Sequence, residues 1–189
     1  MRLRAIHRAL LVFVAASAGA CTTSHMTPAM IAYGSNQPTI APPPTDPDQP
    51  GFVRPGQPFS CVPYARQASG IGLVGDAYTW WDQAEGRYAR EAMPRSGTLL
   101  VLVNYAGPKR AHLAYVTRIV SSREIRIDHA NWLNDGNIYL NSPVIDVSAA
   151  NDWTEVRVWN NRDGHMGIKT YNVRGFITPF QIAALPPFS

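Results

Sequence analysis

The sequence contains very little cysteine. Cys21 and Cys61 are the two cysteines among 189 residues, and their spacing fits no zinc pattern, so we expect no metal site. Cys21 follows a short apolar stretch at the start of the chain, whereas Cys61 opens its globular part. If Cys21 is cleaved off or lipidated, Cys61 remains as a single free thiol, which is a candidate reactive group.

The chain also lacks a large excess of charge. It has 17 basic and 13 acidic residues, a formal net charge of +4. Arg2, Arg4 and Arg8 lie in residues 1–20, which carry no acid, so the rest of the chain is close to neutral. This balance gives no electrostatic reason to expect a nucleic-acid partner.

Nucleotide-binding motifs are missing as well. The glycine-rich residues 70–75 lack the Lys-Ser/Thr ending of a phosphate-binding loop, and their glycine spacing is not a dinucleotide fingerprint. We therefore interpret this stretch as a turn and expect no cofactor.

No apolar run near the start is long enough for a stable transmembrane anchor. Residues 1–20 combine a basic start, a short apolar run and a small-residue end, which predicts a secretory signal peptide. Residues 18–21 resemble a bacterial lipoprotein cleavage site with Cys21 as the lipidated residue, and ordinary cleavage after Ala20 is the alternative. We expect an exported protein, anchored to a membrane through Cys21 or else periplasmic or secreted.

Proline is concentrated in one region. Residues 22–58 hold nine of the sixteen prolines and show no periodicity, so residues 21–58 are predicted to be the lipidation site followed by an extended tether. Residues 59–178 have a globular composition and are predicted to form one monomeric domain, with a tail at residues 179–189.

Within this domain, helical signals come first and strand signals follow. One helix is predicted from Cys61 to the stop at Gly70, and a second over residues 77–84. Strands are predicted at residues 98–103, 111–120, 124–132, 151–160 and 175–177. Because short connections make neighbouring strands antiparallel, we predict an α+β fold with N-terminal helices packed on an antiparallel β-sheet.

The first helix suggests a chemical use for Cys61. Ser60 is a suitable capping residue and Pro63 fits the first turn, so Cys61 should lie at the helix N-terminus. The partial positive charge at that end stabilises a thiolate, which is the nucleophilic form of cysteine. The alternative is a buried and inert apolar cysteine.

The alternation of side chains along the predicted strands indicates that His112 lies near Cys61. His112 shares a face with Ala114, and on the next strand His129 and Asn131 share a face with two isoleucines. Since these isoleucines should pack against the first helix, we predict that His112 reaches Cys61 as its base. The alternative for His112 is a hydrogen-bonded core histidine.

Three residues are candidates for the third member, which would orient His112. Asn131 lies on the predicted face, and its amide oxygen accepts an imidazole N–H, so we prefer it. His129 shares that face but is a weaker partner unless it is neutral. Asp128 would be the best partner electrostatically, yet strand alternation points it away unless a β-bulge intervenes.

Several short motifs follow one another through the domain: CVPYAR at residues 61–66, WW at 80–81, PRSGTLL at 94–100, HLAYV at 112–116, IDHANW at 127–132 and YNVRGFI at 171–177. In this order they resemble the CHAP domain, the cysteine- and histidine-dependent amidohydrolase/peptidase family. The resemblance implies a papain-like fold over residues 59–178, with Cys61 as the nucleophile and His112 as the base. Many members have Glu-x-Asn in the third strand, whereas this chain has His129 at the glutamate position and then Asn131.

The resemblance also implies a substrate. CHAP domains cut amide bonds of peptidoglycan, either between muramic acid and the first alanine or within the stem or cross-bridge peptide. On this basis Tyr64, Trp80, Trp81 and Trp132 are candidate walls of the substrate cleft, and no metal or cofactor is implied.

Two other functions fit the same motifs. One is a non-catalytic wall-binding module, in which the change at His129 has removed the activity. The other is a thiol acyltransferase or lipase that acts on membrane lipid, because related papain-like folds have such activities. A greasy tunnel beside Cys61 would favour a lipid substrate, and an open polar groove would favour a peptide.

Overall fold

The computed structural model describes residues 48–181. The predicted signal peptide, the lipidation site Cys21, most of the tether and most of the predicted tail lie outside the described residues. Within the described part, no helix is both long enough and apolar enough to cross a membrane. The domain boundaries at residues 59 and 178 stay predictions, although the β-sheet includes residues on both sides of this range.

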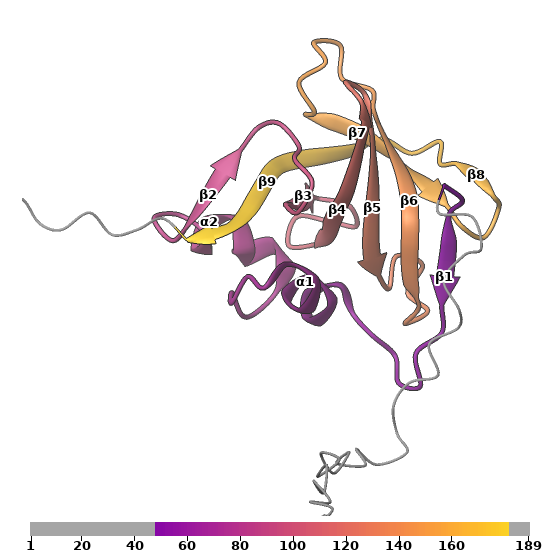
Figure 1. Cartoon of the computed structure of the whole chain (residues 1–189), viewed down its shortest axis with the longest axis horizontal. Coiled ribbons are helices and arrows are strands. Elements are labelled where there is room, and N and C mark those ends of the chain that lie inside the picture. The colour runs from indigo at the N-terminus through magenta and orange to yellow at the C-terminus, as the bar shows by residue number, and fades with distance from the viewer. Residues whose placement is uncertain (1–47, 182–189) are drawn as a thin grey trace, which may run out of the picture. The chain divides into compact units, whose positions relative to one another are not determined.

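The described part of the chain consists mainly of β-strands, with short helices near its start (Figure 1). The helical elements are α1 (Cys61–Ser69), the 3-10 turn η1 (Ala77–Thr79) and α2 (Trp80–Gln83). The strands are β1 (Gly51–Val53), β2 (Tyr88–Glu91), β3 (Leu99–Val103), β4 (Ala111–Ser121), β5 (Glu124–Ala130), β6 (Ile138–Asp146), β7 (Glu155–Asn160), β8 (His165–Met166) and β9 (Tyr171–Gln181).

Six of these strands close into an antiparallel barrel. Each strand pairs with the next in the order β6, β5, β4, β3, β9 and β7, and β7 then pairs with β6 to complete the ring. The closing pairs include Val144 with Val158 and Asp146 with Val156. The short strands β1, β2 and β8 extend the sheet by pairing with β6, β9 and β7.

The predicted α+β, papain-like arrangement of helices on a sheet is therefore wrong. The α-helices have 9 and 4 residues, too few to form a layer over a sheet, and the sheet closes on itself. β1, β2, β6 and β8 were not predicted from the sequence. Of these, β6 makes the closure possible because it pairs with both β5 and β7. Its Asn141, Ser142 and Pro143 are residue types found in turns, and they conceal the strand.

β3 and the first half of β4 are buried on both faces, which explains the continuous apolar sequence of β3 and the mainly apolar start of β4. Leu100 of β3 and Ala114 of β4 point into the barrel, where a core drawn from all six barrel strands packs. Val101 and Leu113 point the other way, into an outer core that includes residues of α1, η1 and α2. All four side chains are at most 1% exposed.

The helix that begins at Cys61 packs on this outer face. Cys61 and Val62 contact the outer core, whereas Ile125 and Ile127 belong to the barrel interior. The prediction that this helix covers the isoleucine face is therefore wrong, because closure of the barrel encloses that face.

Candidate active site

α1 begins where two neighbouring strands of the barrel part. β4 and β5 are paired over part of their lengths. Ser121 pairs with Glu124 at one end of the paired region, and Tyr115 pairs with Asp128 at the other. Beyond this point β4 continues along β3, while β5 continues along β6. α1 contacts both β4 and β5, so a group at its N-terminus on the outer surface can approach a side chain that points inward.

Cys61 is the first residue of α1, and its side chain is half-buried. The backbone N–H groups of Leu113, Cys61 and Val62 act on the sulfur and favour the thiolate, and the charge of Arg110 does so as well. Because Leu113 directly follows His112, the sulfur lies beside the segment of β4 that carries this histidine.

The helix N-terminus does not by itself make Cys61 a thiolate. Burial raises the pKa of the Cys61 thiol above its ordinary value of 9.0 and outweighs the backbone N–H groups, which lower it. Ser60 occupies the N-cap position, but its side chain makes no capping hydrogen bond. The predicted stabilisation of the thiolate is therefore smaller than the cost of desolvation, and the neutral thiol needs a base.

His112 is hydrogen-bonded to a second histidine. Its Nε2 lies 3.0 Å from Nδ1 of His129, and the two rings are nearly perpendicular, at 83°. His112 is 2% exposed and His129 is fully buried. The pair thus lies on the inward side of β4 and β5, with little contact with bulk solvent.

Both histidines are neutral at neutral pH. Burial lowers the pKa of His112 to about 3 and also holds the pKa of His129 well below its ordinary value. In a neutral pair one nitrogen donates and the other accepts. When Nε2 of His112 donates to Nδ1 of His129, Nδ1 of His112 is free to accept a proton. Nε2 of His129 then carries its own proton and is buried without a hydrogen-bond partner among the described residues.

Asn131, the preferred third member, makes no hydrogen bond to His112 within the described residues. Its backbone φ is 60°, so the extended alternation of β5 ends before it. Its Oδ1 accepts the N–H of Gly136 at 2.8 Å, and the carbonyl of Gly136 accepts the N–H of Phe59 at 3.0 Å. Asn131 therefore holds the loop that supports the segment leading into Cys61.

Asp128 lies on the other side of β5 from the histidine pair, as strand alternation predicts. Its carboxylate accepts the N–H of Asn141 at 2.7 Å, and burial raises its pKa. On the same side lies Tyr64 of α1, whose pKa is raised first by burial and then by the negative charge of Asp128. Asp128 therefore faces the helix and does not orient His112.

Aromatic rings surround the histidine pair, and Tyr139 lies 5.6 Å from His129 between centroids. The ring of Trp132, a predicted cleft wall, lies 4.8 Å from His112 and 5.4 Å from His129, between centroids. Tyr105 stacks on Trp132 at 6.0 Å and meets the ring of His112 at 5.9 Å. Sequence reasoning missed Tyr105 because it lies in a turn-bearing loop, where no periodic pattern marks a side chain.

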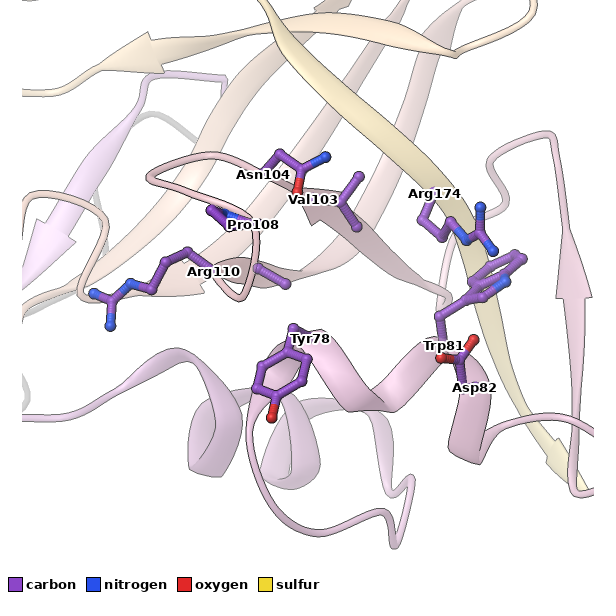
Figure 2. A pocket seen from close by; sticks show the side chains of 9 residues that line it. Tyr78, Trp81, Asp82, Val103, Asn104, Pro108, Arg110 and Arg174 are labelled. Carbon is purple, nitrogen blue, oxygen red and sulfur yellow. The ribbon is translucent and has the colours of Figure 1, made fainter.

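The other predicted cleft walls have different surroundings. Tyr64 packs edge-on against Phe59, with ring centroids 6.3 Å apart. Trp80 is fully buried in the outer core, so it has no surface to offer a substrate. Trp81 is partly buried and lines a pocket next to the site (Figure 2).

The structure thus has a half-buried cysteine at a helix start beside the strand that carries His112. His112 is hydrogen-bonded to His129 and not to Asn131, the preferred candidate. Residues 53–131 match the family model of the CHAP domain. Over this part the chain is similar to the CHAP domain. The match confirms the resemblance and includes Cys61, His112, His129 and Asn131. No curated protein and no solved structure matches the chain. The CHAP domain indicates a function of the peptidoglycan hydrolase or amidase type.

Proposed function

We propose that this chain hydrolyses an amide bond of peptidoglycan, with Cys61 as the nucleophile and His112 as the general base. The observation that carries the proposal is the placement of the Cys61 sulfur beside the Leu113 N–H, one residue from His112, whose Nε2 is held by His129. The CHAP match over residues 53–131 supports the substrate class.

The reaction begins with proton transfer from the Cys61 thiol to Nδ1 of His112. The sulfur attacks the amide carbonyl, and backbone N–H groups at the start of α1, which have no partner within the helix, face the developing oxyanion. The tetrahedral intermediate collapses, the C–N bond breaks, and the leaving amine takes the proton from His112. Water, deprotonated by His112, then hydrolyses the thioester and restores the thiol.

His129 is the orienting group in this scheme. A neutral imidazole accepts the Nε2–H of His112 through Nδ1, which fixes the ring and leaves Nδ1 of His112 for the thiol. This bond brings no negative charge to the pair, in contrast to the glutamate of many CHAP domains. The imidazolium that forms during the reaction is therefore stabilised by a dipole.

The surroundings of Cys61 favour a peptide over a lipid. The adjacent pocket is lined by the charged residues Asp82, Arg110 and Arg174, and it is open rather than a greasy tunnel (Figure 2). An acyl chain gains little from such walls, whereas the polar groups of a peptide are well matched to them.

The test is release of soluble fragments from purified peptidoglycan, identified by mass spectrometry. Cys61→Ala should abolish release while its thermal unfolding stays close to that of the parent. Ser60→Ala is the matched control, because the Ser60 side chain makes no capping bond, and it should retain release. Fragment masses distinguish cleavage at the muramic acid–alanine bond from cleavage within the peptide. Undiminished release by Cys61→Ala would remove Cys61 from the mechanism, and intact wall binding without release by the parent would identify a binding module.

We also propose that the chain is exported and anchored through a lipid on Cys21. The support is the sequence of residues 1–21, with its basic start, short apolar run and small residues before the cysteine. Cys21→Ala should move the protein from the membrane fraction to the soluble fraction. If the parent and the variant fractionate alike, the anchor is absent.

A further inference from the structure

A cavity of about 260 Å³ lies next to the candidate active site. Its lining includes Tyr78 and Trp81 from the helical segment, Arg110 before β4, and Arg174 of β9. Figure 2 shows Arg110 and Arg174 on opposite sides of the pocket, with the two aromatic side chains near the helices.

One wall of this pocket depends on a close approach between Trp81 and β9. A Cβ atom at Gly175 would lie 2.4 Å from the Trp81 ring, so the ring occupies space that any other residue would fill. Gly175 has φ of +142°, a conformation that other residues rarely adopt. The indole is thus packed against the backbone of β9 in a defined position.

Next to Gly175, β9 has a β-bulge at Arg174, whose side chain is exposed. Val101 of β3 pairs with Gly175, while the next residue, Leu102, pairs with Val173, so Arg174 is the extra residue of a β-bulge. Bulges re-aim side chains and are common beside functional sites. Here the bulge brings the Arg174 guanidinium to 5.9 Å from the centre of the Trp81 ring.

No ion pair among the described residues neutralises the charged side chains of the pocket. Among the described residues, Arg110, Arg174 and Asp82 make no side-chain hydrogen bond or ion pair. By contrast Arg90, whose guanidinium lies 5.1 Å from the centre of the Trp81 ring, is paired with Glu85 at 2.9 Å. Two guanidinium groups and one carboxylate therefore leave a net positive charge. An anionic group can bind there without breaking an existing ion pair.

The pocket is also adjacent to the nucleophile. Its residue Ala111 belongs to the outer core against which Cys61 packs, and the charge of Arg110 acts on the Cys61 sulfur. A substrate whose scissile carbonyl lies at Cys61 therefore has a neighbouring segment within reach of Arg174.

We propose that this pocket is a subsite for a carboxylate-bearing residue of the peptide substrate, with Arg174 as its main anchor and Trp81 as the apolar wall. The proposal rests on the proposed function and narrows its substrate to stem peptides in which a carboxylate near the cleaved bond is free. A guanidinium fork binds a carboxylate through two parallel hydrogen bonds, and an amide in the same place loses the charge.

The test uses two synthetic muramoyl tripeptides that differ in one group, the free or amidated α-carboxyl of their glutamate. The parent should cleave the acidic form with a kcat/KM about tenfold higher, since a charge-assisted bond of this kind contributes about this factor. Arg174→Gln should remove the preference, by weakening cleavage of the acidic form, while Arg157→Gln, an exposed arginine outside the pocket, should keep it. Arg174 is substituted rather than Arg110 because the charge of Arg110 also acts on Cys61, so its loss would change the thiol as well as the pocket.

Calorimetry separates this proposal from the hydrolase mechanism. Cys61→Ala should bind the acidic tripeptide more tightly than the amidated one, and the double variant Cys61→Ala/Arg174→Gln should bind both equally. If purified peptidoglycan releases no fragments but this binding difference is found, the hydrolase proposal fails and the subsite stands. Equal affinities of Cys61→Ala for the two tripeptides would overturn the subsite. The same holds if Arg157→Gln loses the preference for the acidic tripeptide as fully as Arg174→Gln does.

Discussion

His112 Nε2 and His129 Nδ1 are 3.0 Å apart, inside the mouth of a closed barrel and shielded from water. His129, which orients the proposed base His112, is thus itself an imidazole. Neither ring is charged at neutral pH. The orientation of His112 depends on one hydrogen bond between neutral groups and on the packing of Trp132 against both rings.

This pair predicts a graded response to substitution at position 129. His129→Ala removes the acceptor and leaves Nε2 of His112 unpaired, so kcat should fall on the order of 100-fold. His129→Asn restores an acceptor oxygen of suitable size and should recover part of that loss, with KM nearly unchanged in both variants. Steady-state kinetics on peptidoglycan fragments measure the effect. Equal activities of the alanine and asparagine variants would show that His129 does not orient His112.

The thiol of Cys61 should react with electrophiles mainly at alkaline pH. Burial raises its pKa above 9.0, and alkylation requires the thiolate, so the rate with iodoacetamide should increase with pH through and beyond that value. A thiolate–imidazolium pair in the resting protein would instead give a rate that is nearly flat from mildly acidic to neutral pH. Mass spectrometry of the alkylated protein records the rate, and a flat profile contradicts the neutral resting state.

The buried histidines should also make the fold sensitive to acid. The pKa of His112 falls from 6.5 in the unfolded chain to about 3 in the folded protein, so the unfolded state binds more protons between these values. Protonation of His112 therefore costs no stability above pH 6.5. Below pH 6.5 it lowers the free energy of unfolding by about 1.4 kcal/mol for each pH unit. His129 adds to the slope in the same direction.

Urea unfolding at pH 7.5, 6 and 5 measures this slope. The double variant His112→Gln/His129→Gln should be less stable at pH 7.5 but should have a flatter pH dependence. His165→Gln changes an exposed histidine and should leave the slope of the parent unchanged. Parallel curves for the double variant and the parent would exclude the histidine pair as the cause.

Gly175 should tolerate no side chain. In Gly175→Ala the new Cβ would overlap the Trp81 ring and the Glu91 carbonyl, at 2.4 and 2.7 Å, so the free energy of unfolding should decrease by about 3 kcal/mol. Gly164→Ala is the control, since Gly164 also has a positive φ but no atom lies within 4 Å of its Cβ position. That variant should lose about 1 kcal/mol. Equal losses would show that Trp81 moves aside at little cost.

Sequence patterns predicted the local elements around the site better than their assembly. The continuous apolar run of β3 and the alternation of β5 marked these strands. Alternation also placed His129 on the face of Ile125 and Ile127, which we expected to meet the helix and which the barrel encloses. Alternation failed at Asn131 because a left-handed φ of 60° takes that residue out of the extended conformation. The bulge at Arg174 arises from pairing with β3 and leaves no signal in a single strand.

The fold class and the thiol pKa were predicted wrongly for a shared reason. Closure of the barrel through β6 depends on contacts with β5 and β7, which no local pattern encodes. Closure also determines which face of the sheet α1 meets and how deeply Cys61 is buried. Capping and periodicity reveal where a helix starts, but desolvation depends on the neighbours that the complete fold supplies.

The separation of β4 and β5 has a consequence for which parts of the chain the candidate site requires. Cys61 belongs to the helix at this opening, and His112 belongs to a ring of strands that β7 and β9 complete. A fragment that ends before β7 would still contain this thiol and this imidazole, but it would lack the strands that close the ring. Alignment of the two side chains therefore requires residues far beyond both of them in the sequence.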